Sequence, residues 1–138
     1  MDSPTQRDSR TSWQASKLAF ASRILLGLTL ISGGINNFLV RNPVSNPTPE
    51  ADRFLTFLNE TGYMLQAVAI TEITVGILLL AGRFIPLALA LFAPILINIL
   101  LFHVFIQFAG VEAALLATAL YAYLVYLHRD RFSDILSP

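Results

Sequence analysis

Four apolar stretches, each close to twenty residues long, make up most of this 138-residue chain. An α-helix needs about 20 mostly apolar residues to cross the hydrocarbon core of a bilayer. The stretches cover residues 18–40, 62–82, 84–107 and 111–127. Apolar residues lie on all sides of each one, which is not typical of an amphipathic surface helix. The sequence therefore predicts four membrane-spanning helices.

Composition supports a membrane protein and excludes several classes of function. Hydrophobic residues form 55% of the chain and charged residues 13%, against about 25% charged in soluble domains. The chain has no cysteine, which excludes disulfides, thiolate metal sites and iron–sulfur ligation within this polypeptide. His103 and His128 are its two histidines, so no metal site is predicted. The net charge of zero argues against nucleic-acid binding, which needs a basic face.

The connections between the apolar segments define the expected fold. Gly82-Arg83 joins the second and third segments, and about three residues around Gly110 join the third and fourth. Links this short force antiparallel neighbours. The sequence predicts an all-α, up-down-up-down four-helix membrane bundle over residues 18–132. Residues 1–17 are expected to form a flexible cytoplasmic tail, and residues 133–138 a short cytoplasmic C-terminal tail.

The first connection is longer and begins with the proline-rich run RNPVSNPTPE. Thr48 followed by Pro49 is a plausible N-cap and first helical position. The next residues place an apolar cluster, at positions 54, 55, 57 and 58, on one side of a short helix. We expect this helix to lie at the membrane interface in the first outer loop.

The basic residues predict the orientation of the bundle, because cytoplasmic loops carry an excess of lysine and arginine. One side carries six basic residues and the other two, which places both termini in the cytoplasm. The six are Arg7, Arg10, Lys17, Arg83, Arg129 and Arg131, and the two are Arg41 and Arg53.

Polar side chains inside the segments are the candidate functional residues. Each costs several kcal/mol at bilayer depth unless it faces the bundle interior and finds a partner. With a rise of about 1.5 Å per residue, Glu72 falls near the midplane, while Arg23 lies toward the cytoplasmic face and His103 toward the outer face. The candidates are Arg23, Asn36, Gln66, Glu72, Asn98 and His103.

Helical phase predicts which of these residues face another helix. In the first segment, Arg23 shares a stripe with Gly27, Leu30, Gly34 and Asn37, and in the second, Glu72 shares one with Ala69 and Gly76. Small residues allow helices to approach closely in a membrane. An Arg23–Glu72 ion pair between the two helices is within side-chain reach, and pairing would offset much of the burial cost.

Helical phase does not decide whether the two polar residues of the third segment face the same cavity. Asn98 and His103 lie about 140° apart on an ideal helix, so they face one cavity only if a bend at Pro94 rotates the later turns. Structural roles are the alternative for four of the candidates: Arg23 extending to the surface, Asn98 joining helices, and Glu72 and His103 packing within the bundle.

Three pieces of sequence resemble the DoxX family of small four-helix bacterial membrane proteins: SRILLGLTLISGGINNFL, TEITVGILLLAGRFIPLAL and APILINILLFHVFI. The resemblance covers roughly residues 18–132. Family members often have a lysine after the first asparagine of the first segment, where this chain has Asn37. The resemblance implies a multi-pass protein of the bacterial inner membrane, and it supports Arg23, Asn36, Glu72, Asn98 and His103 as site residues.

Some members are described as subunits of membrane redox complexes, and three hypotheses follow. In the first, the chain is an accessory subunit that binds a quinone, or a similar lipid, for a quinone-linked oxidoreductase. Glu72 and His103 are then the catalytic candidates, and Arg23, Asn36, Gln66 and Asn98 the cofactor-binding ones. Electrons would come from partner proteins, no tightly bound cofactor is expected, and the chain could form homo-oligomers. The second hypothesis is a non-catalytic scaffold or lipid-binding protein, and the third a proton-coupled carrier that titrates Glu72.

Overall fold

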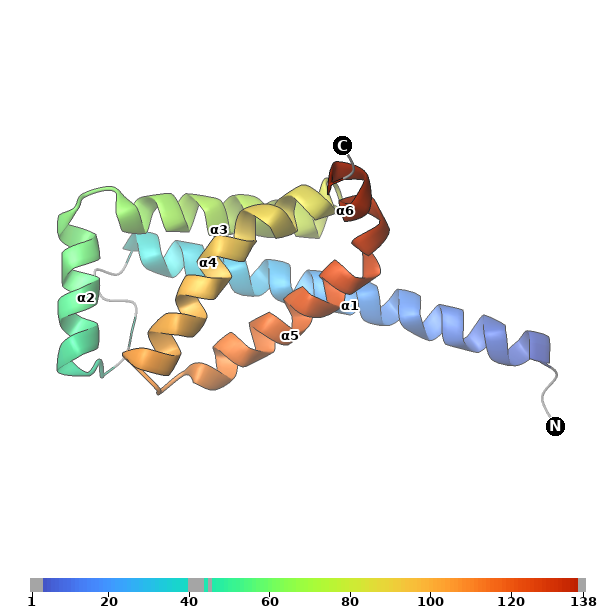
Figure 1. The fold of residues 1–138 in the computed structure, drawn as a ribbon, viewed down its shortest axis with the longest axis horizontal. Helices are drawn as coiled ribbons and strands as arrows, with labels where there is room; N and C mark the ends of the chain where they lie inside the picture. Colours follow the sequence, from blue (N-terminus) through green and yellow to red (C-terminus); the bar gives the residue numbers. More distant parts are fainter. Residues whose placement is uncertain (1–3, 40–43, 45, 137–138) are drawn as a thin grey trace.

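The computed structural model describes the backbone of residues 4–39, 44 and 46–136, and the side chains of residues 14–39, 44 and 46–132. This part of the chain is built from helices alone (Figure 1). In order they are α1 (Pro4–Leu39), α2 (Pro49–Glu60), α3 (Met64–Ala81), α4 (Ile85–Phe105), α5 (Val111–Leu127) and α6 (Arg129–Leu136). The predicted all-α class is confirmed.

Three of these helices are long and apolar enough to cross a membrane: the portion of α1 over Gln14–Leu39, all of α3 and all of α4. The fourth predicted segment forms α5, which is apolar but has 17 residues. At about 1.5 Å per residue α5 is about 25 Å long, slightly shorter than a typical hydrocarbon core of about 30 Å.

The first helix is longer than a membrane span requires. It has 36 residues, or about 54 Å at the standard rise, and its N-terminal part extends past the rest of the bundle (Figure 1). Residues 4–17, which the sequence predicts as a flexible tail, form the beginning of this helix. At the other end of the chain, α6 occupies most of the predicted C-terminal tail and was not foreseen.

The turn between α3 and α4 follows from its residues. Gly82 has φ 67° in the left-handed region, which glycine adopts without the steric cost of a Cβ. The N–H of Arg83 then donates to the carbonyl of Leu78 at 3.2 Å, and Pro86 lies in the first turn of α4, where proline is tolerated. The short link makes α3 and α4 neighbours, as predicted.

The short helix α2 lies across one end of the bundle (Figure 1). Its predicted cap is confirmed, because the hydroxyl of Thr48 accepts a hydrogen bond from the N–H of Ala51 at 3.2 Å. Ala51 and Leu55 are buried, whereas Phe57 is 63% exposed. Its apolar residues therefore face both the bundle and the outside.

The hydrophobic core occupies the end of the bundle opposite α2. It joins Val75 and Leu79 of α3 to side chains of α1, α4 and α5, the largest of them Phe92. Along α4 the core extends as far as Leu96, and beyond a bend this helix diverges from α3 (Figure 1). Glu72, three residues before Val75, therefore lies at the edge of the core.

Candidate functional site

Helices α1 and α3 pack along a stripe of small residues, as their helical phase predicts. A Cβ on Gly76 would lie 2.6 Å from Cγ1 of Ile31 and 2.7 Å from the carbonyl oxygen of Gly27. One on Gly34 would lie 2.8 Å from the carbonyl oxygen of Ala69. The two backbones thus touch where the side chains are absent. We call this contact the α1–α3 seam.

Glu72 lies beside this seam and is 5% exposed. Its Oε2 accepts a hydrogen bond of 2.9 Å from Nδ2 of Asn37 on α1. Gly33 faces the carboxylate, since a Cβ built there would lie 3.7 Å from each carboxylate oxygen. A buried carboxylate with an amide partner and a glycine in front of it can hold a proton and bond a second polar group.

Arg23 does not pair with Glu72, so the expected ion pair is wrong. The guanidinium lies beside Gly82, where a Cβ would be 2.6 Å from Nη1 of Arg23. Gly82 is ten residues beyond Glu72, which is about 15 Å along a helix. In the antiparallel packing, α1 brings Gly33 and Asn37 opposite the carboxylate and carries Arg23 to the end of α3.

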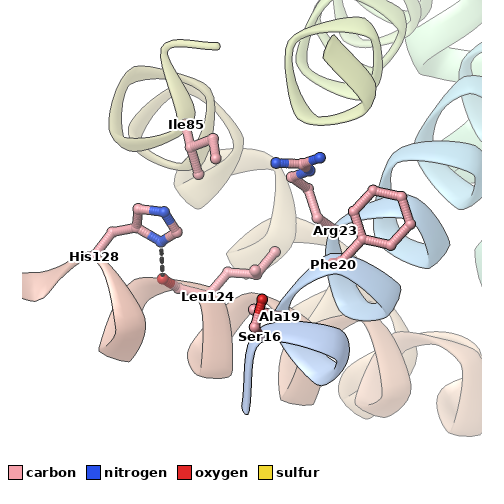
Figure 2. Close-up of a pocket in the computed structure, with 7 residues that line it drawn as sticks. All are labelled: Ser16, Ala19, Phe20, Arg23, Ile85, Leu124 and His128. Carbon is pink, nitrogen blue, oxygen red and sulfur yellow. Dashed lines mark hydrogen bonds between the residues drawn. The ribbon is translucent and has the colours of Figure 1, made fainter. Parts of the chain in front are cut away.

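A cavity of about 270 Å³ opens beside Arg23, at the end of the bundle where α3 gives way to α4. Figure 2 shows the guanidinium and the ring of His128 facing it from two sides. The Nε of Arg23 is buried without a hydrogen-bond partner. The residues that line the cavity come from α1, α4 and the end of α5: Ser16, Ala19, Phe20, Arg23, Ile85, Leu124 and His128.

His103 is held at the turn that follows α4. Its Nδ1 donates to the carbonyl of Gln107 at 2.9 Å, because a carbonyl oxygen can only accept. A Cβ on Gly110 would lie 3.1 Å from Cε1 of His103, so the ring packs against the backbone of the turn. This histidine is 31 residues from Glu72, in the half of α4 that has diverged from α3.

Gln107, 2% exposed, joins the same turn to α2. Its Oε1 accepts from the N–H of Thr48 at 2.8 Å, and the Thr48 hydroxyl donates to the carbonyl of Ile106 at 3.0 Å. Thr48 thus bonds across to α4 as well as capping its own helix. Sequence reasoning identified the cap but not this link, because two residues 59 positions apart carry no shared local pattern.

The three amide candidates occupy separate places. Asn98 is exposed, and its Nδ2 donates to the carbonyl of Pro94 in its own helix at 2.9 Å. The bend in α4 therefore does not bring Asn98 and His103 to one interior cavity. Asn36 is exposed on α1. Gln66 has a buried Oε1 without a hydrogen-bond partner, and six residues place it about 120° round α3 from Glu72.

The six predicted candidates are therefore dispersed over the bundle rather than gathered in one polar interior. Glu72 and its amide partner occupy the seam, and Arg23 occupies the cavity at the end of the bundle. Among the described residues, no three histidine or carboxylate side chains lie together as metal ligands would. Sequence reasoning missed two contributors. Asn37 shares the stripe of Gly34, but the stripe alone does not fix its height against Glu72. His128 gave no signal beyond being a histidine.

A protein-family model described as DoxX matches residues 18–105 of the chain. The match includes both halves of the seam and all of α4. It ends before α5, and therefore before Leu124 and His128 of the cavity. No curated protein and no solved structure matches the chain.

Proposed function

The chain belongs to the DoxX family, and from that premise we propose that it serves a membrane redox complex as a quinone-interacting accessory subunit. The observation that carries the proposal is the carboxylate of Glu72, buried beside the seam at the edge of the core and bonded to Asn37. A carboxylic acid at bilayer depth is a functional candidate by default, because burial there is costly.

The chemistry needed from this chain is proton handling and hydrogen bonding. A quinone takes up electrons and protons together, and the electrons would come from a redox partner protein. Glu72 is suited to hold or release a proton, with Asn37 fixing the orientation of Oε2. Gly33 lets the α1 backbone pack close to the carboxylate, so Glu72 and Asn37 form a compact polar pair between the two helices.

Other predicted ligands support the proposal unequally. Gln66 keeps a buried amide oxygen without a partner, and Asn36 is exposed on the first helix. Asn98 and His103 already bond to backbone carbonyls. We therefore assign the proton-handling role to Glu72 alone and keep His103 as a residue that shapes the turn after α4.

Membrane placement is part of the same proposal. We infer four crossings, by α1, α3, α4 and the shorter α5, in the inner membrane with both termini cytoplasmic and α2 at the outer interface. The exposed phenylalanine of α2, Phe57, is consistent with lipid contact. Many large apolar side chains on α1, α3 and α4 are also exposed, which leaves surface for lipid, a redox partner or a second copy.

The absence of cysteine makes this topology directly testable. Single-cysteine variants Thr56→Cys in α2 and Asp130→Cys in α6 would be treated with a membrane-impermeant maleimide on intact cells. We expect labelling of the first variant before lysis and of the second only after lysis. Labelling of both in intact cells, or the reverse order, would contradict the inferred orientation.

Quinone binding tests the function itself. The purified protein in detergent would be incubated with a short-chain ubiquinone or menaquinone, separated from free ligand, and extracted for mass spectrometry. Glu72→Gln is expected to lower the bound quinone at least fivefold, because it removes the ionisable group while keeping the size. Glu60→Gln, at an exposed carboxylate of α2, should change nothing. Equal binding by parent and Glu72→Gln would refute the proposal.

A scaffold without catalytic function is the second candidate, and specific contacts favour it. The bond of Asn37 to Glu72 joins α1 to α3, and the bond of Thr48 to Gln107 joins the start of α2 to the turn after α4. Polar groups in this chain therefore connect separate elements of the bundle. Under this reading Glu72→Gln lowers stability but leaves ligand binding unchanged, which is the result that separates the two functions.

A further inference from the structure

We propose that the cavity beside Arg23 binds the phosphate headgroup of an anionic membrane lipid. The cavity lies at the end of the bundle opposite α2 and has a volume of about 270 Å³. It combines one permanent positive charge, one histidine and one hydroxyl with apolar walls. This is the chemistry of a charged headgroup attached to acyl chains.

The guanidinium of Arg23 lines this cavity and gives it a permanent positive charge. Its Nε is buried and has no hydrogen-bond partner, and the described part of the chain pairs it with no carboxylate. The ring of Phe20 lies 5.3 Å from its central carbon, which holds the planar group by a cation–π contact. Guanidinium groups bind phosphate through two parallel N–H bonds, which favours this ligand over a neutral one.

Two further features add donors or positive potential. Nδ1 of His128 donates to the carbonyl of Leu124 at 2.9 Å, and the ring faces the cavity (Figure 2). The Nε2 of this ring accepts in the neutral imidazole, and it donates to an anion when the ring is protonated. Helix α4 begins at Ile85 in the cavity wall, and Phe84 before it gives no side-chain cap. The uncapped N–H groups at this helix end favour an anion.

The depth of the cavity favours a lipid over phosphate dissolved in water. Arg23 lies beside Gly82, in the turn where α3 ends, so it is level with the boundary between hydrocarbon and headgroups if α3 and α4 span the bilayer. Ala19, Phe20 and Leu124 supply apolar wall for the upper acyl chains.

This site is separate from the one proposed for quinone. Ten residues of α3, about 15 Å, lie between Gly82 and Glu72, and the polar contacts of Glu72 come from another part of α1. A variant that empties the lipid site should therefore leave quinone binding at its parental level, and loss of quinone binding in Glu72→Gln should leave lipid binding intact.

Native mass spectrometry of the purified full-length protein tests the inference. The delipidated protein would be titrated in separate experiments with phosphatidylglycerol, phosphatidylcholine, diacylglycerol and inorganic phosphate. We expect one tightly held phosphatidylglycerol, at least tenfold weaker binding of phosphatidylcholine, and no retained diacylglycerol. Arg23→Gln should weaken phosphatidylglycerol binding at least tenfold, while Arg83→Gln, at an exposed arginine of the same end, should change it less than twofold.

A second variant of the same cavity keeps the inference testable if Arg23→Gln does not fold. Ala19→Trp fills the cavity from its wall without touching the charge, and it should also weaken phosphatidylglycerol binding at least tenfold. Equal loss in Arg83→Gln would show non-specific attraction and overturn the site. Binding of inorganic phosphate that displaces the lipid would assign the cavity to a soluble anion and refute the lipid inference, as would parental lipid binding in both Arg23→Gln and Ala19→Trp.

Discussion

Helices α1 and α3 contact each other in a different way from helices α4 and α5. In the first pair, glycines bring two backbones into contact, and a buried carboxylate is bonded across the seam by Asn37. In the second pair, the hydroxyl of Tyr121 on α5 donates to the carbonyl of Leu89 on α4 at 3.2 Å. Asn98 and His103 of α4 instead bond to backbone carbonyls of their own chain segment.

This difference separates two uses of polar residues in apolar helices. A polar group that bonds within its own helix satisfies itself locally and places no demand on a neighbour. One that bonds to another helix fixes register and distance, and loses its partner if either helix moves. By this criterion Glu72 of the first pair couples two helices, whereas Asn98 of the second does not.

The largest effect is expected at the centre of the seam. Gly76→Ala adds a Cβ that would lie 2.7 Å from the carbonyl oxygen of Gly27 and 2.6 Å from a side-chain carbon of Ile31. Since the carbonyl is backbone, the helices must separate, and we expect a loss of about 1–3 kcal/mol in the free energy of unfolding. Thermal unfolding of the purified protein in detergent would measure it.

Gly33→Ala is the matched control on the same helix pair. Its Cβ would make ordinary contacts of 3.7 Å with the carboxylate oxygens, and replacing a helical glycine by alanine favours the helix by up to about 1 kcal/mol. Stability should be unchanged or higher. If both variants lost stability equally, close backbone contact would not be what distinguishes the α1–α3 seam.

A smaller effect is expected for the polar link beside the seam. A double-mutant cycle with Asn37→Ala and Glu72→Ala should give a coupling energy of about 0.6 kcal/mol, and no more than about 1.7 kcal/mol, as for other hydrogen bonds between membrane helices. The bond of 2.9 Å between the two side chains is the physical reason. Reversible unfolding in a detergent mixture provides the energies. If the losses of stability in the two single variants add up to the loss in the double variant, the two side chains are not coupled.

The smallest effect is expected on the other pair of helices. Asn98 is exposed and bonds to the carbonyl of Pro94 in its own helix, so Asn98→Ala should change stability by less than about 0.5 kcal/mol. Combined with Glu72→Ala it should show no coupling. A measurable coupling energy between Asn98 and Glu72 would contradict this expectation, because it would show a polar interaction between the two helix pairs.

Much of the fold follows from local sequence. The lengths of the apolar segments, the Thr48 cap, the short Gly82-Arg83 link and the stripe of small residues through Gly34 each act over a short stretch of chain, so the sequence alone reveals them. The helical continuation of α1 back to Pro4 escaped this reasoning. Polar residues there suggested a tail, but polarity does not by itself break a helix.

The site depended on tertiary structure because it depends on register. Sequence placed Arg23 and Glu72 on facing stripes, but a stripe repeats about every turn and does not say which residues stand at the same height. Packing of glycine against backbone sets that height: it gives Glu72 an amide partner and takes Arg23 to the end of the bundle, beside a histidine 105 residues away. The sequence by itself therefore determined which residues are costly to bury, and only the assembled helices decided how each is satisfied.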